Sequence, residues 1–196
     1  MSIDPAEPAM TSRADLHDGL AALLRYPGPE HRAVGESYLA LARQLAPEVA
    51  DAVAKYLEET AGLAIEGLEE LYTVTFDLSP VVTLEIGWHL FGEQYERGAF
   101  LARLREELAT AGVAEQGELP DHLTLVLPLL GRLPAGARRE SLAAPLRQAL
   151  VKMHAAVDET PNPFRHLLTA ADRLVGPTPT AEADSAPPAP RSGETP

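Results

Sequence analysis

An all-α fold is expected from the composition of the chain and from the spacing of its apolar residues. Of the 196 residues, 45% are hydrophobic but only 5% are aromatic. Alanine and leucine dominate, and both favour helices, whereas sheets prefer β-branched and aromatic residues. Apolar residues recur at the spacing of one buried helix face through most of the chain. Because the length suits one sizeable core, we expect a single-domain helical bundle.

Four helices are expected in the first part of the chain. Ser12 followed by Asp15 resembles a capping box, and Pro27 ends the helix that starts there. Pro47 can start a later helix, and Gly62 stops it. The expected helices cover residues 12–26, 30–46, 47–61 and 65–77.

The middle of the chain contains one ambiguous segment and two clear helices. Residues 81–91 begin with β-branched residues, but a lone strand would have no pairing partner, so we expect a helix or an ordered loop. Tyr95–Ala111 is expected to form a helix that Gly112 closes. Residues 123–130 are apolar on nearly every side, which is typical of a central helix, although Pro128 interrupts them.

The strongest helical periodicity follows residue 136. Its apolar face consists of Leu142, Leu146, Ala149, Leu150, Met153 and Val157. A last helix is expected after Asn162, which can cap it, with Pro163 at the first helical position. Residues 1–11 and 176–196 lack apolar periodicity and are expected to be disordered. The expected organisation is therefore one helical domain, residues 12–175, between two disordered tails.

The net charge and the composition exclude several kinds of partner and of site. The net charge of −13 repels nucleic acid phosphate and anionic lipid, and it attracts cationic partners. There is no cysteine, so thiolate metal sites and a cysteine nucleophile are excluded. The first ten residues lack the basic and apolar regions of a signal peptide, and no apolar run is long enough to span a bilayer. We therefore expect a soluble, cytoplasmic protein.

The stretch from Glu118 to Leu123 combines a proline, two acids and a histidine at the start of the apolar run. One interpretation is a helix start, with Pro120 at the first helical position and acids near the positive end of the dipole. The other is an acid–base pair of Asp121 and His122. Adjacent residues on a helix point about 100° apart, which argues against catalysis by this pair.

One set of histidine and glutamate spacings is compatible with a metal site. His89 lies four residues from both Glu85 and Glu93, so a helix would place all three on one face. Gly87 and Gly92 weaken that helix, and a partly buried histidine between solvated acids is the better explanation of the pattern, because ligand sets are rarer than such coincidences. None of the recognisable catalytic templates occurs in the chain. We expect no catalytic residues, no metal and no resident cofactor.

An interaction surface is the better hypothesis. The aromatic residues Tyr72, Phe76, Trp88, Phe91 and Tyr95 are interleaved with acids. The acids are Glu66, Glu69, Glu70, Asp77, Glu85, Glu93 and Glu96. An apolar groove with an acidic rim would bind a basic amphipathic helical peptide, although such aromatic stripes are also common in cores.

Several motifs occur in an order that resembles a known family. They are Leu23-Leu24-Arg25-Tyr26-Pro27, Leu71-Tyr72-Thr73-Val74-Thr75-Phe76-Asp77, His89-Leu90-Phe91-Gly92-Glu93-Gln94-Tyr95-Glu96-Arg97-Gly98, Glu118-Leu119-Pro120-Asp121-His122-Leu123 and Asn162-Pro163-Phe164. Across residues 12–175 the chain resembles the NarJ-type assembly chaperones of respiratory nitrate reductase and related molybdenum enzymes, in the wider TorD-like family.

This resemblance implies an all-helical protein that is not an enzyme. Such chaperones bind the N-terminal region of the catalytic subunit, a twin-arginine signal or its remnant, and hold the subunit until its bis-molybdopterin guanine dinucleotide cofactor is inserted. Cofactor insertion proteins are further candidate partners. The positions that match the family motifs are Tyr72, Phe76, Asp77, Glu93, Tyr95, Glu118, Pro120, Asp121 and His122.

Two positions depart from the family pattern, and two other functions stay open. Phe164 stands where tyrosine is common, and residues 73–75 lack an acid that is usual there, which affects the expected peptide selectivity. A metal-dependent helical hydrolase would use His89, Glu85, Glu93 and His122. A non-catalytic adaptor would recruit another protein through residues 176–196.

Overall fold

The computed structural model describes residues 12–158 and 161–176. Its elements are α1 (Arg13–Leu23), α2 (His31–Leu45), α3 (Pro47–Glu59), α4 (Ile65–Tyr72), the π-helix η1 (Thr73–Asp77), α5 (Ile86–Phe91), α6 (Tyr95–Ala111), α7 (Leu123–Arg132), α8 (Ala137–Val157) and α9 (Phe164–Val175). The expected all-α class is confirmed. The expected disorder of residues 1–11 and 177–196 concerns residues outside these ranges, and the domain limits stay a prediction.

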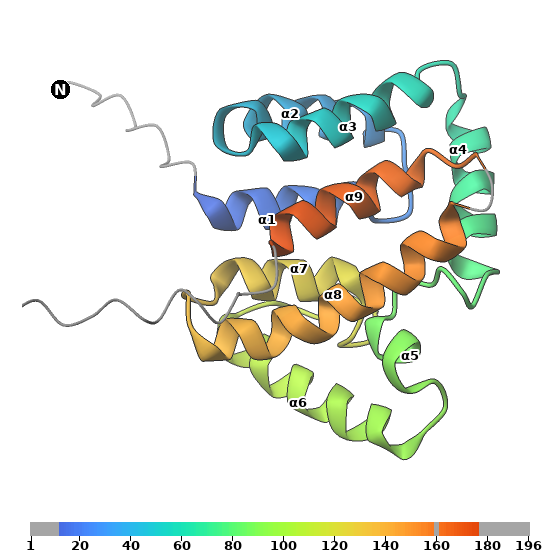
Figure 1. The fold of residues 1–196 in the computed structure, drawn as a ribbon. Helices are drawn as coiled ribbons and strands as arrows, with labels where there is room; N and C mark the ends of the chain where they lie inside the picture. The colour runs from blue at the N-terminus through green and yellow to red at the C-terminus, as the bar shows by residue number, and fades with distance from the viewer. Residues whose placement is uncertain (1–11, 159–160, 177–196) are drawn as a thin grey trace, which may run out of the picture.

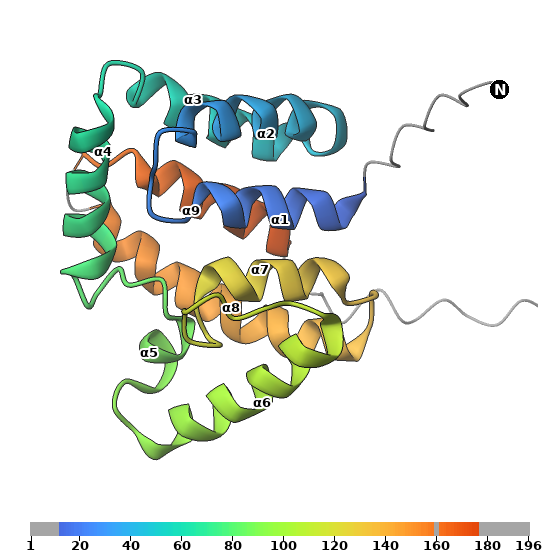
Figure 2. The same cartoon turned by 180° about the vertical axis from the view of Figure 1, so that it is seen from behind.

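The helices stack in layers. Figure 1 shows α2 and α3 above α1 and α9, with α7 and α8 below them and α5 and α6 at the bottom. The view from behind shows α4 and η1 running along one end of these layers, next to α5 (Figure 2). The most extensive packing joins α1 to α7 and α3 to α9. The chain is therefore wrapped around α1, α7 and α9.

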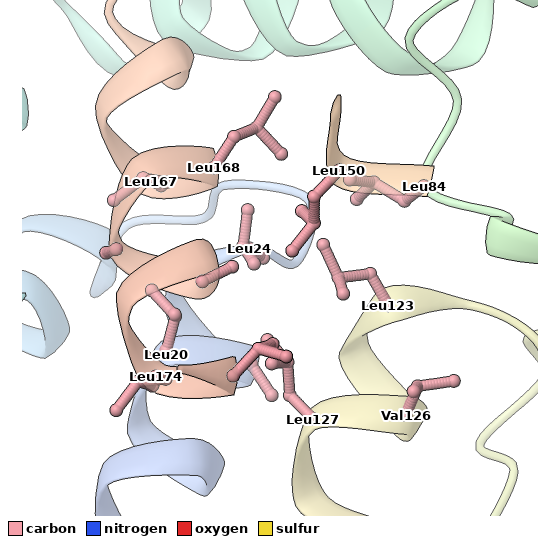
Figure 3. Packing of buried hydrophobic residues seen from close by; sticks show 14 of the residues in the cluster. Leu20, Leu24, Leu84, Leu123, Val126, Leu127, Leu150, Leu167, Leu168 and Leu174 are labelled. Atoms are coloured by element: carbon pink, nitrogen blue, oxygen red, sulfur yellow. The ribbon is translucent and has the colours of Figure 1, made fainter. Parts of the chain in front are cut away.

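The apolar run is the centre of the core, as its sequence predicts. Every residue from 123 to 130 is buried. Figure 3 shows Leu123 and Leu127 of α7 in one cluster with leucines of other helices, among them Leu20 of α1 and Leu168 of α9. Full burial of one such side chain stabilises the fold by about 1.5–3 kcal/mol. The predicted apolar face of α8 is also buried, and the expected last helix is present as α9.

Most helix ends follow their sequence signals. Ser12 and Asp15 form the predicted capping box, Pro47 opens α3, and Gly112 closes α6 in a left-handed conformation. Asn162 Oδ1 accepts the Phe164 N–H at 3.0 Å, although α9 begins one residue later than expected. The predicted helix 65–77 is continuous, but its last turn is a π-helix, which periodicity did not predict.

The expected helix start at Pro120 was wrong. Pro120 does not occupy the first helical position, because α7 begins at Leu123 with an extended His122 before it. The expectation of a helix or an ordered loop for residues 81–91 is confirmed, since a loop leads into α5, but Glu85 of this loop also forms an isolated antiparallel bridge with His122 that was not expected. Ile86 N–H donates to Asp121 O at 2.9 Å, and Leu123 N–H donates to Leu84 O at 2.8 Å. Pro120 and Asp121 lie in a turn that the His122 N–H closes by donating to Leu119 O at 2.9 Å. This turn and the extended His122 delay the start of α7 to Leu123.

A buried carboxylate fastens this region. Asp121 is fully buried, and its Oδ2 accepts the Gly87 N–H at 3.1 Å and the Arg97 Nε–H at 3.3 Å. Arg97 also donates to Glu85 Oε2 at 2.6 Å and lies 5.7 Å from the Trp88 ring centroid. Burial raises the pKa of Asp121, while the Arg97 guanidinium acts in the opposite direction. The start of α7 is thereby tied to both α5 and α6.

His17 is a second buried polar group, in α1. Its side chain is fully buried, and its Nδ1 lies 2.8 Å from Arg13 O. Burial lowers the pKa of His17 from 6.5 to about 4, and the nearby Arg139 and Arg13 charges act in the same direction. The folded protein therefore holds this ring neutral.

No helix in the described ranges is both long and apolar enough to cross a membrane.

Gly87 should not tolerate a side chain. A Cβ there would lie 2.5 Å from Asp121 Oδ2 and 3.1 Å from Phe100 Cδ1. We expect Gly87→Ala to lower the free energy of unfolding by about 1–3 kcal/mol. The matched control is Gly98→Ala in α6, where a Cβ would meet nothing within 4 Å. That change should be neutral or stabilising by up to about 1 kcal/mol. Equal stability of the two variants in denaturant unfolding would contradict the tight Gly87–Asp121 contact.

Stability should fall as the pH drops from about 6.5 towards 4, because unfolding frees His17 to bind a proton that the folded state rejects. This shift corresponds to a loss of up to about 3 kcal/mol. Denaturant unfolding at several pH values measures it, and His17→Gln should flatten the pH dependence. An unchanged slope in that variant would show that other groups are responsible.

Candidate functional site

A cavity of about 370 Å³ lies where the end of α1, the π-helix and the segment before α7 meet. Its walls are Arg25, Tyr26, Tyr72, Asp77, Gln116, Glu118, His122, Thr124 and Leu125. Three of the sequence motifs, which are far apart along the chain, thus contribute side chains to one cavity. Of the predicted site residues, the cavity brings together Tyr72, Asp77, Glu118 and His122.

The π-helix explains how Tyr72 and Asp77 reach the same cavity. Its hydrogen bonds join residues five apart, as in the Leu78 N–H to Thr73 O bond of 2.9 Å. Side chains five apart lie on similar sides of this wider turn, whereas an α-helix would turn them apart. Thr75 fixes the turn, because its hydroxyl donates to Leu71 O at 2.6 Å and accepts from Asn162 Nδ2 at 2.8 Å. π-turns inside helices are frequent at functional sites.

Tyr72 is both a wall of the cavity and part of the core. Only 4% of the residue is exposed, and its hydroxyl donates to Leu24 O at 3.1 Å. Its ring packs edge-on against Tyr26, Phe76 and Phe164 at centroid distances of 5.4, 5.0 and 5.6 Å. Burial raises the pKa of the Tyr72 phenol, so the hydroxyl stays protonated and keeps its hydrogen bond to Leu24 O. Phe76 is 3% exposed and does not line the cavity.

His122 is the histidine in the wall of the cavity. Its Nδ1 lies 2.6 Å from Thr124 Oγ1, and its Nε2 lies 3.9 Å from Glu118 Oε2. Burial lowers the pKa of His122, while Glu118, Glu85 and Asp77 act in the opposite direction. The ring is therefore neutral at pH 7, and the carboxylates of Asp77 and Glu118 face a single cation of the wall, Arg25.

Exposed apolar side chains adjoin the acids of the cavity along the chain. Leu78 follows Asp77 and is 71% exposed, and Leu119 follows Glu118 and is 42% exposed. Tyr26, which lines the cavity, is 55% exposed. Together they place large apolar surfaces beside the carboxylates. This combination suits a ligand with both a cationic and an apolar side chain.

The other predicted site residues lie elsewhere. Asp121 and Pro120 are buried, and Asp121 fastens α5 and α6 as described above. Glu93 and Tyr95 are exposed near the start of α6, with Tyr95 91% exposed, and neither lines the cavity.

The continuous aromatic groove expected from the sequence is also absent from the described residues. Trp88 lies under Arg97, and the Phe91 ring packs 5.5 Å from that of Phe100. Tyr72 and Phe76 belong to a separate cluster around Phe164. The aromatic spacing therefore marks mainly core contacts.

Some cavity residues were not predicted as site residues. Arg25 and Tyr26 belong to a motif that the sequence analysis named, but the motif alone does not indicate that they line a cavity. They line it because they come just after α1. Gln116 reaches the wall from a turn in which its own φ is 52°. No local sequence signal announces such a contact.

The residues of the hydrolase alternative do not form a metal site. Glu85 is paired with Arg97, and His89 Nε2 lies 2.7 Å from Thr83 O. Within the described ranges, no three histidine or carboxylate side chains are placed to share a metal ion. The alternative therefore finds no support in this geometry.

Comparisons with known proteins agree with the motifs. The family model described as "Nitrate reductase delta subunit" matches residues 41–170. The NarJ protein of Bacillus subtilis, named a probable nitrate reductase molybdenum cofactor assembly chaperone, is 31% identical over 119 residues. The NarJ chaperone of Escherichia coli K12, which carries the same description, is 28% identical over 127 residues. A crystal structure of a proposed redox enzyme maturation protein from Archaeoglobus fulgidus covers 89% of this chain and 99% of its own, with a TM-score of 0.56 and 19% identity.

The extent of these matches decides what they establish. The alignments with the two NarJ proteins cover 60% and 63% of this chain and 65% and 54% of the relatives. The structural match establishes the fold alone, because its sequence identity is low. The family model, however, covers more than half of the 196 residues. The chain therefore belongs to the nitrate reductase delta subunit family, the group of NarJ- and TorD-like proteins that its motifs indicated.

Proposed function

We propose that this protein is a cytoplasmic assembly chaperone for a nitrate reductase or a related molybdenum enzyme. It binds the N-terminal region of the catalytic subunit and holds that subunit while the molybdenum cofactor is inserted. It acts by binding and not by catalysis. The names of its NarJ relatives support the client class. The observation that carries the proposal is the cavity in which three separate family motifs meet.

The cavity suits one kind of peptide side chain at its centre. Asp77 and Glu118 offer carboxylates to a lysine or arginine of the peptide. The Tyr72 ring forms part of the wall, and aromatic faces attract such cations. A charge-assisted hydrogen bond in this partly enclosed site is stronger than the same bond on an open surface.

Affinity should come mainly from apolar contacts around the cation. Exposed ion pairs contribute only about 0–1 kcal/mol each. The exposed side chains of Tyr26, Leu78 and Leu119 can instead bury apolar peptide surface at about 25 cal/mol per Å². The acids then provide orientation, selectivity and faster association in an acidic chain of net charge −13.

Calorimetric titration with the N-terminal peptide of the client subunit tests this proposal. The wild-type chain should bind the peptide, and Asp77→Asn combined with Glu118→Gln should weaken binding about tenfold or more, since two charge-assisted contacts are lost. Glu66→Gln with Glu70→Gln is the matched control, because both acids are exposed on α4 outside the cavity. No binding at high micromolar peptide, or equal weakening by the control pair, would contradict the proposed site.

A second pair of variants separates the cavity wall from the core behind it. Tyr72→Leu removes the aromatic ring from the cavity wall together with the hydroxyl that bonds Leu24 O. It should weaken peptide binding, and it should lower stability by more than the ~0.5–1.5 kcal/mol of the lost hydrogen bond. Phe76→Leu should lower stability to a similar or larger extent but leave binding by the folded protein nearly unchanged. Chemical unfolding and calorimetry on both variants distinguish these effects. If Phe76→Leu weakened binding more than Tyr72→Leu does, Phe76 and not Tyr72 would belong to the binding site.

A further inference from the structure

A second cavity, of about 270 Å³, lies at the opposite end of the α1–α7 pair from the first. The first cavity adjoins the end of α1 and the start of α7, whereas the second adjoins the start of α1 and the end of α7. Its walls are Arg13, Leu130, Gly131, Leu133, Ala135, Gly136, Arg139 and Glu140. Figures 1 and 2 both place the starts of α1 and α8 together at this end, away from α4. An α1 of 11 residues separates the two cavities by about 16 Å along its axis.

This cavity is basic in a strongly acidic protein. Arg13 and Arg139 both line it, and neither forms an ion pair with another described residue. The one acid in the wall, Glu140, is already paired with Arg147. The positive charge of the two lining arginines is therefore not balanced within the cavity.

One side-chain nitrogen of Arg139 is a hydrogen-bond donor without an acceptor in the described part of the chain. This nitrogen, Nη2, is buried. Burial and the Arg13 charge lower the pKa of Arg139, and Arg147 acts in the same direction, while Glu140 acts in the opposite one. A buried cationic donor without a partner is costly, and the negative charge of an anion beside the guanidinium would offset part of that cost.

The start of α8 adds backbone donors at the same place. Gly136, which lines the cavity, precedes the helix with φ at 135° and no side chain caps it. The N–H groups of the first turn of a helix lack partners within the helix, and the helix dipole favours negative charge there. Gly131 keeps the opposite wall close, because a Cβ would lie 2.8 Å from His17 Cβ.

We propose that this cavity binds a small multivalent oxyanion of the phosphate class, held between Arg13 and Arg139 at the start of α8. Arginine forks match phosphate oxygens in a bidentate manner. A volume of about 270 Å³ admits a phosphate or a pyrophosphate group but is small for an entire nucleotide. The inference is independent of the peptide site and goes beyond the proposed chaperone function.

His17 provides a local reporter of binding. Its pKa is lowered to about 4 by burial, with Arg139 and Arg13 acting in the same direction and Asp18 in the opposite one. An anion that neutralises the two arginines should raise the pKa of His17. The wall residue Gly131 contacts this ring, so the effect should be confined to His17 among the six histidines of the chain.

The test titrates the full chain with phosphate and with pyrophosphate, against sodium chloride at equal ionic strength, followed by calorimetry and by nuclear magnetic resonance of the histidine rings. We expect saturable binding of at least one anion and an upward shift of the His17 pKa. Arg139→Gln and Arg13→Gln should each weaken binding about tenfold or more. Arg138→Gln is the matched control, since Arg138 is the neighbouring residue on α8, faces Glu107 at 3.7 Å and does not line the cavity.

Three outcomes would overturn the inference. In the first, phosphate and pyrophosphate bind no more tightly than chloride, which means that the cavity has no site for this class of anion. In the second, the Arg138 variant loses as much binding as the Arg139 variant, in which case the effect is general electrostatic attraction. In the third, binding occurs without a change at His17, in which case the anion lies elsewhere.

Discussion

The buried carboxylate of Asp121 is the interaction on which the cavity beside α1 and η1 depends. It accepts hydrogen bonds from the Gly87 backbone and from Arg97, and thereby fixes the start of α7 against α5 and α6. The neighbouring bridge between Glu85 and His122 holds His122, a wall residue of the cavity, in an extended conformation. Removing a partner from such a buried charged group is strongly destabilising, because the remaining charge is left unpaired. Asp121 therefore supports the cavity without lining it.

The family motifs form a connected set once they are placed in the fold. Tyr72 of one motif bonds Leu24 O of another, and Asn162 of a third holds Thr75 in the π-turn. Phe164 completes the aromatic cluster behind the cavity, with its ring 5.1 Å from that of Phe76. The motifs thus divide between residues that line the cavity and residues that position them. This division explains why mutation of a motif residue is informative only when stability and binding are both measured.

The sequence predicts the helices far better than the cavity. Periodicity, capping residues and prolines locate most helices, because these signals are local. The expected helix start at Pro120 was wrong, since a proline is compatible with a helix start but also with a turn, here the one that the His122 N–H closes by donating to Leu119 O. The π-turn at Thr73–Asp77 was not predicted because it depends on distant contacts such as Asn162 with Thr75. Burial of Tyr72 and Phe76 could not be read from their spacing, which a groove and a core share. Arg25 and Gln116 reach the cavity only through tertiary packing.

Direct mapping of the bound peptide tests the central claim most directly. Backbone and side-chain resonances of the full chain can be followed by nuclear magnetic resonance as the client's N-terminal peptide is added. The account predicts that the largest shifts cluster at Tyr26, Asp77, Leu78, Glu118 and His122, with little change on α2. Shifts concentrated on α2, or at Glu93 and Tyr95 beside α6, would contradict it and would move the peptide site away from the cavity.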